Sequence, residues 1–110
     1  MQTTIAFLIN NKFDINIPQE VTHLFLDDSY TILDSFSAKS SQEILYFDYL
    51  VFDNFDKLDR FIIEKEHKRA ITNYYMQTNI ENFFAIGEAS NCLLPLDEQL
   101  ERIIESIISE

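Results

Sequence analysis

The chain alternates between short apolar runs and short polar breaks, and most of the runs predict β-strands. Residues 5–9 are apolar and precede two turn-forming asparagines, so they form either a strand or the tail of a helix. Residues 13–17 alternate apolar with polar side chains, as in a half-buried strand. Residues 21–26 and 30–36 are two further β-like runs, joined by a short polar turn.

The middle of the chain contains the most apolar run. Residues 43–52, EILYFDYLVF, are rich in aromatic and β-branched types, which predicts a single strand buried on both faces at the centre of a sheet. Residues 82–86 predict a second buried strand, which ends at Gly87, and residues 70–75 predict a short one.

In two stretches the apolar residues recur with the spacing of a helix instead of a strand. In residues 53–66 the apolar side chains fall on one helical face, with Asp53 or Asn54 as the N-cap, which predicts a middle helix. After Pro95 a stronger stripe predicts a C-terminal helix packed on the sheet. The stripe consists of Leu96, Leu100, Ile103, Ile104, Ile107 and Ile108. The expected fold is α+β (α/β-like), with a mostly antiparallel strand meander, buried strands and these two helices.

Length and charge narrow the class of protein. The chain has 110 residues and 46% hydrophobic content, so we expect a single domain, residues 1–110, with one core. Its net charge of -11 repels nucleic acid and anionic membranes, so neither is an expected partner. The N-terminal residues resemble neither a signal peptide nor a membrane span, so a cytoplasmic location is expected.

The candidate catalytic and metal-binding residues lie far apart in the sequence. Cys92 is the sole cysteine, which excludes an intramolecular disulfide or a cysteine zinc site, and it has no basic neighbour to activate it. His23 and His67 stand apart from any nucleophile. The aspartates of residues 27–28 and 53–59 are typical of turns and helix starts rather than metal sites. We predict no catalytic residue and no metal site.

Residues 78–88 hold the only glycine of the chain, Gly87. They read Thr-Asn-Ile-Glu-Asn-Phe-Phe-Ala-Ile-Gly-Glu, which resembles a pattern of the thioredoxin reductase and NADP-ferredoxin reductase type of flavoprotein. In that family, Thr-Ser/Asn-x-x-x-Phe-Phe/Tyr-Ala-x-Gly-Asp leads from the pyridine-nucleotide domain back to the flavin domain. The resemblance covers residues 12–108, and FDYLVFDNFDKLDRF is similar to the family's preceding buried strand, loop and helix.

The resemblance implies a candidate cofactor site at Gly87, Glu88 and Ala89. In the family the glycine lets the backbone approach the flavin, the next acid binds a ribityl hydroxyl, and a helix begins near the flavin ring. This sequence departs from the family: it has no GxGxxG loop, it has Glu88 in place of Asp, and its last helix is bulky. We therefore expect no cofactor on the isolated chain, and FAD only if another polypeptide completes the site.

Three functions stay open. The first is a reductase-derived domain without its own cofactor site, which acts by association as a homodimer or with a protein partner. The second is a fragment or subunit of a thioredoxin reductase-like, FAD-dependent oxidoreductase. The third is an unrelated acidic α+β binding protein, in which Gly87 marks a plain strand-to-loop turn. We expect the chain not to be catalytic alone.

Overall fold

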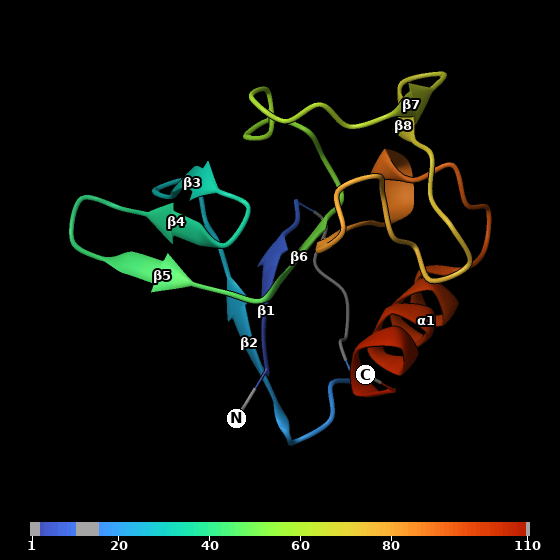
Figure 1. The fold of residues 1–110 in the computed structure, drawn as a ribbon, viewed down its shortest axis with the longest axis horizontal. Helices are drawn as coiled ribbons and strands as arrows, with labels where there is room; N and C mark the ends of the chain where they lie inside the picture. The colour runs from blue at the N-terminus through green and yellow to red at the C-terminus, as the bar shows by residue number, and fades with distance from the viewer. Residues whose placement is uncertain (1–2, 11–15, 110) are drawn as a thin grey trace.

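A computed structural model describes residues 3–10 and 16–109 (Figure 1). Its elements are β1 (Thr3–Leu8), β2 (Val21–Phe25), β3 (Thr31–Asp34), β4 (Ser37–Lys39), β5 (Ile44–Tyr46), β6 (Tyr49–Phe52), β7 (Lys65–Glu66), β8 (Arg69–Ala70), β9 (Phe83–Ala85), the 3₁₀ helix η1 (Gly87–Ala89) and α1 (Leu96–Ile108). Strands in both parallel and antiparallel sheets, together with one long helix, confirm the α+β class.

The larger sheet is parallel. Its four strands lie in the order β2-β1-β6-β9, and every neighbouring pair runs in the same direction. The antiparallel meander is confined to the sheet β3-β4-β5. A smaller antiparallel pair is formed by β7 and β8. The β-like runs predicted at residues 21–26 and 30–36 form β2 and β3, which belong to different sheets.

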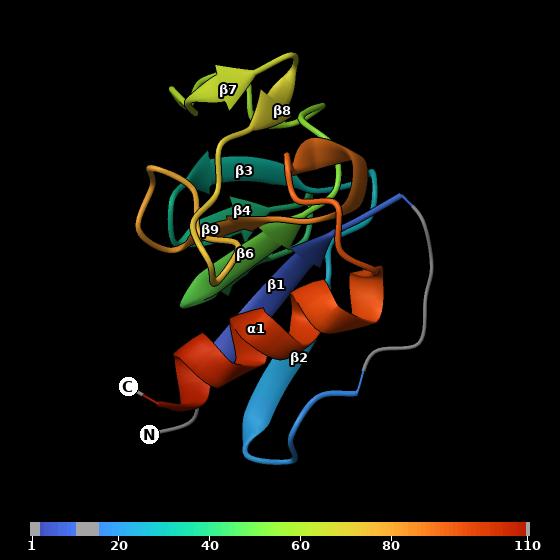
Figure 2. The ribbon, with the colours of Figure 1, turned by 90° about the vertical axis from the view of Figure 1, so that its right-hand side faces the viewer.

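The parallel sheet is covered by a different layer on each face. Figures 1 and 2 show α1 on one side of this sheet and the strands β3, β4 and β5 on the other. Alternate residues of each strand enter the two cores, as the period of a strand requires. The α1 side contains Ile5, Phe7, Val51, Phe84, Ile86, Leu100, Ile103 and Ile107. The opposite side contains Ala6, Leu8, Leu50, Phe52, Phe83, Ala85, Ile32, Ala38 and Phe47. The predicted strands 5–9 and 82–86 and the C-terminal helix are thereby confirmed.

The single buried strand predicted at residues 43–52 is wrong, because the run divides into β5 and β6. The break falls at Phe47 and Asp48. The Asp48 Oδ2 atom accepts a hydrogen bond from the Thr4 N–H at 2.8 Å, and the Asp48 N–H donates to the Thr4 carbonyl at 2.9 Å. These bonds attach the start of β6 to β1, whereas β5 pairs with β4 and leaves Ile44 and Tyr46 exposed.

The middle helix predicted at residues 53–66 is also wrong, because this segment is a series of turns that ends in β7. Two of its basic side chains form long-range hydrogen bonds to the backbone. The Lys57 amine donates to backbone carbonyls of the β2–β3 connection, and the Arg60 guanidinium donates to carbonyls of β3. The apolar residues Phe55, Leu58 and Phe61 still contact the core, so the periodic pattern reports burial and not a helix.

The remaining predictions have mixed outcomes. Of the strand expected at residues 70–75, Ala70 alone belongs to a strand, β8. The polar stretch after residue 36 contains β4, which was not predicted. The strand expected at residues 13–17 lies mostly in residues 11–15, outside the described residues. No helix in the described part of the chain is long and apolar enough to cross a membrane.

Candidate functional site at the carboxyl edge of the parallel sheet

The carboxyl ends of β2, β1, β6 and β9 meet at one edge of the parallel sheet. The connection after β1 leads to β2 on one side of β1, and the chain later returns as β6 on the other side. In open parallel sheets, ligands bind outside the carboxyl ends of the strands at such a change of direction. This edge is therefore the candidate functional site, and Gly87 lies on it directly after β9.

A crevice opens at this edge between the ends of β1, β2 and β6. Its volume is about 220 Å³. Its lining residues are Leu8, Ile9, Asn10, Leu26, Asp27, Asp28, Asn54, Asp56 and Lys57. Acidic and amide side chains dominate this lining.

Asp53 joins the ends of β1 and β6. Its side chain is buried, and its Oδ1 atom accepts hydrogen bonds from the Asn10 N–H and the Asn54 Nδ2, both at 2.9 Å. The Asp53 N–H donates to the Leu8 carbonyl at 3.2 Å. A buried carboxylate that accepts two hydrogen bonds fixes the local backbone. Asp53 was expected to cap a helix, and the structure gives it this bridging position instead.

Lys57 is the one basic residue among the described residues that line the crevice, and its amine donates hydrogen bonds to backbone oxygens. Its Nζ atom lies 3.2 Å from the Asp27 carbonyl and 2.9 Å from the Asp28 carbonyl, and it also donates to the Tyr30 carbonyl. The amine thus stabilises the turn after β2.

Asp27 supports the same turn from its own side chain. The Ser29 hydroxyl donates to Asp27 Oδ1 at 2.5 Å, and the Ser29 N–H donates to the same oxygen at 2.9 Å. These two hydrogen bonds stabilise the carboxylate and lower the pKa of Asp27 below its ordinary value.

Gly87 adopts a left-handed backbone conformation, with φ of +57°. That angle is unfavourable for residues with a Cβ atom, so a glycine is favoured where β9 turns into η1. Space is not the reason: a Cβ atom at this position would lie 3.5 Å from Leu96 Cδ2 and 3.8 Å from Asp53 Cβ, which are ordinary contacts. The local geometry accounts for the only glycine as a strand-to-helix turn.

Gln99 is the residue that sequence reasoning missed at this site. Its side chain is 2% exposed, and its Oε1 atom accepts a hydrogen bond from the Gly87 N–H at 2.9 Å. Its Nε2 atom donates to the Leu94 carbonyl at 2.7 Å and to the Cys92 carbonyl at 3.4 Å. The signal was available, because position 99 falls on the apolar stripe of the last helix between Leu96 and Leu100.

Glu88 and Ala89, the other two candidate residues, lie next to Gly87 in η1 but differ in environment. Glu88 is exposed, whereas Ala89 is buried and its N–H donates to the Ile86 carbonyl at 3.1 Å. The first turn of α1 adds the carboxylates of Asp97 and Glu98.

The donors at this edge are a poor fit for a phosphate-bearing cofactor. The N–H groups of Gly87 and Ala89 already donate within the chain, and α1 begins with two acids where a phosphate would favour positive charge. The crevice of about 220 Å³ is also smaller than the roughly 300 Å³ at which small-molecule sites usually begin.

The other residues considered for chemistry lie on separate elements. His23 is exposed on β2, His67 is exposed in the turn between β7 and β8, and Cys92 is half-buried before α1. Within residues 3–10 and 16–109, no group of three or more His, Cys, Asp or Glu side chains is arranged to hold a metal ion.

Comparison with known proteins gives a weak structural similarity to a reductase. No protein-family model matches the chain, and no curated protein matches its sequence. The fold is similar to a crystal structure of a ferredoxin-flavin thioredoxin reductase from Clostridium acetobutylicum, with a TM-score of 0.35 and 13% sequence identity. The match covers 98% of this chain and 50% of the reductase chain, so this chain spans about half of that length. The similarity is too weak to establish a relationship, and descent from a reductase stays a prediction.

Proposed function

We propose that this chain is a non-catalytic binding domain on a reductase-like scaffold, and that it acts by self-association through the edge strand β5. The observation that carries this proposal is the exposure of Ile44 and Tyr46, which are 51% and 72% exposed on an edge strand whose outer side pairs with no other strand among the described residues. Exposed strand edges with apolar side chains are surfaces on which another strand can pair.

The backbone direction of β5 supports pairing at this edge. The Glu43 carbonyl and the Phe47 N–H bind Ser40 and Phe36, so both face β4. Because backbone groups alternate in direction along a strand, the N–H and C=O groups of Ile44 and Tyr46 face away from β4. These are the groups that a second strand would bind.

A second copy of the chain fits this edge with two-fold symmetry. If two β5 strands pair in opposite directions about Leu45, Ile44 of each copy lies opposite Tyr46 of the other. Pairs of aromatic and β-branched residues across strands are favourable. A two-fold axis is the commonest symmetry of protein dimers.

Charge and size set the expected strength of association. Each copy has a net charge of -11, so repulsion opposes pairing and added salt weakens that repulsion. The strand is only three residues long, which implies a small contact and a weak, reversible dimer. The poor fit of the carboxyl edge for phosphate groups supports a function in association rather than in flavin chemistry.

Sedimentation velocity at increasing protein concentration, in low and high salt, tests the proposal. We expect a reversible dimer that salt strengthens and that Tyr46→Lys abolishes. Leu93→Lys is the matched control, because Leu93 is 92% exposed and lies between η1 and α1, away from β5. The proposal fails if the parent stays monomeric in all conditions, or if Tyr46→Lys dimerises as well as Leu93→Lys.

A further inference from the structure

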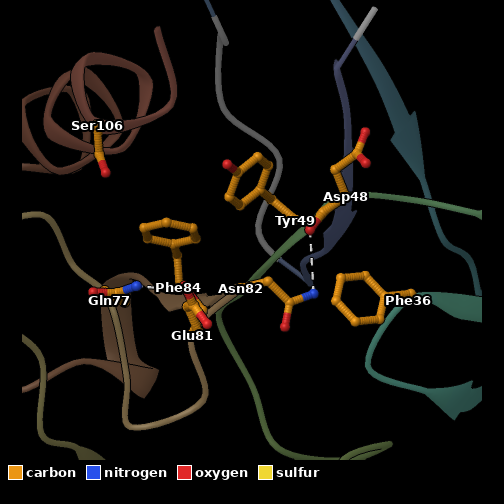
Figure 3. A pocket seen from close by; sticks show the side chains of 8 residues that line it. All are labelled: Phe36, Asp48, Tyr49, Gln77, Glu81, Asn82, Phe84 and Ser106. Carbon is orange, nitrogen blue, oxygen red and sulfur yellow. Dashed lines mark hydrogen bonds between the residues drawn. The ribbon is translucent and has the colours of Figure 1, made fainter. Parts of the chain in front are cut away.

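A second cavity lies at the opposite edge of the parallel sheet, where β6 and β9 begin. Its volume is about 310 Å³. Its lining residues are Phe36, Asp48, Tyr49, Gln77, Glu81, Asn82, Phe84 and Ser106, which are shown in Figure 3. They come from the β3–β4 turn, the segments that begin β6 and β9, and α1, so the cavity gathers distant parts of the sequence.

Aromatic rings form the walls of this cavity. Figure 3 shows the side chain of Asn82 with the ring of Phe36 on one side and the rings of Tyr49 and Phe84 on the other. Phe36 is 54% exposed, and the rings of Tyr49 and Phe84 are 5.8 Å apart between centroids. Such walls favour an apolar chain or a cation held against a ring face.

The amide of Asn82 has a fixed orientation. Its Nδ2 atom donates to the Ser35 carbonyl and to the Asp48 carbonyl, the latter at 3.2 Å. Because carbonyl oxygens can only accept, the amide nitrogen must face them and the Oδ1 atom must point away, as Figure 3 shows.

The Oδ1 atom of Asn82 is an unused acceptor. Asn82 is 8% exposed, and no hydrogen bond to its Oδ1 atom forms among the described residues. No side-chain oxygen or nitrogen in that part of the chain is both sealed from solvent and unpartnered, so Oδ1 opens into the cavity that Asn82 lines. A nearly buried acceptor of this kind favours a ligand that donates a hydrogen bond.

Charge determines which donor fits. Among the described residues, the lining includes the carboxylates of Asp48 and Glu81 and no Lys, Arg or His. Neither carboxylate forms an ion pair with a basic side chain in residues 3–10 and 16–109. Asp48 Oδ2 accepts the Thr4 N–H, so this carboxylate keeps its negative charge at the rim of the cavity. The cavity therefore combines negative charge, an unused acceptor and aromatic walls.

We infer that this cavity binds a protonated primary amine on a short apolar chain. The ammonium group donates to Asn82 Oδ1 and is attracted by the negative charge that Asp48 and Glu81 give to the lining, while the methylene groups lie against the ring of Phe36. The amine belongs either to a free small molecule or to a lysine side chain of another polypeptide. The inference is independent of pairing at β5, since it rests on other residues.

Titration of the ¹⁵N-labelled chain, followed by NMR, tests this inference with n-butylammonium as the probe and butan-1-ol as its neutral control. At roughly 0.15 M salt, which screens exposed charges beyond about 8 Å, we expect saturable shifts at the amides of Tyr49, Glu81 and Asn82. Butan-1-ol should cause no saturable shift there. An acetylated and amidated Ala-Lys-Ala peptide then identifies the source: tenfold tighter binding indicates a lysine side chain, and equal affinity indicates a free amine.

Three variants make the test specific. Glu81→Gln removes one exposed carboxylate and should weaken binding by about fivefold, the upper range for an exposed charge pair. Phe36→Ala should weaken it by a similar factor. Glu88→Gln is the matched control, because it removes an exposed carboxylate at the other edge of the sheet and should leave affinity unchanged. The inference is overturned if no saturable shift occurs, or if all three variants bind n-butylammonium as the parent does.

Discussion

Replacing Gln99 by methionine should destabilise the domain more than any exposed substitution. Methionine has a similar length and helix propensity, so Gln99→Met removes the hydrogen bonds of the amide without opening a large cavity. The change leaves the Gly87 N–H and the Leu94 carbonyl without their partners at 2.9 Å and 2.7 Å. Because Gln99 is 2% exposed, water has little access to replace these bonds.

The magnitude follows from the two groups that lose their partner. A buried donor or acceptor left unsatisfied costs about 1–3 kcal/mol, so two such groups would cost about 2–6 kcal/mol. Because the Gly87 N–H and the Leu94 carbonyl are part-buried, we expect the free energy of unfolding to fall by the lower part of this range, about 2–4 kcal/mol. For a domain of roughly 100 residues, 1 kcal/mol corresponds to at least about 4 °C in melting temperature, so we expect a decrease of about 8 °C or more.

Urea unfolding followed by circular dichroism measures this effect. Gln42→Met is the control, since Gln42 is exposed and its side chain forms no hydrogen bond with the described residues. The control should change stability by less than about 0.5 kcal/mol. If Gln99→Met were as stable as the control, the Gln99 amide would not hold the Gly87 turn to α1.

Three further predictions concern the carboxyl edge. Gly87→Ala should lower the free energy of unfolding by about 1–2 kcal/mol in urea unfolding, because φ of +57° is unfavourable for alanine; an unchanged midpoint would contradict this account of the glycine. The isolated chain should not bind FAD, because the N–H groups at Gly87 and Ala89 already donate within the chain; flavin fluorescence quenched at micromolar protein would oppose this expectation. The hydroxyl and N–H of Ser29 lower the pKa of Asp27, so this carboxylate contributes stability above its ordinary value of 3.8 that is lost as pH falls through the lowered pKa. Ser29→Ala should reduce the dependence of stability on pH between about 5 and 3, and an unchanged dependence in urea unfolding would refute this assignment.

The strands with simple patterns could be predicted from sequence because their burial is simple. Residues 82–86 are buried on both faces in β9, as a continuous apolar run predicts. The stripe from Leu96 to Ile108 predicted α1, and the core contains Leu100, Ile103 and Ile107 of this stripe. These elements depend on contacts whose period the sequence shows directly.

The errors arise where one pattern is compatible with two structures. The run 43–52 is equally apolar in its exposed part, β5, and in its buried part, β6, so composition could not locate the break at Asp48. The pattern of residues 53–66 matches a helix, but Lys57 and Arg60 form long-range hydrogen bonds that the sequence does not show. The two cavities were not predicted for the same reason, because each depends on residues distant in sequence.

The most direct test of association through β5 is amide hydrogen exchange as a function of protein concentration. The N–H groups of Ile44 and Tyr46 face away from β4, so only pairing with another strand should protect them. We predict that their exchange slows as concentration and salt increase, whereas the amide of Leu93 exchanges at a constant rate. If the exchange rates of Ile44 and Tyr46 stayed constant over the protein concentrations at which dimers form, this account would be contradicted and the interface would lie elsewhere.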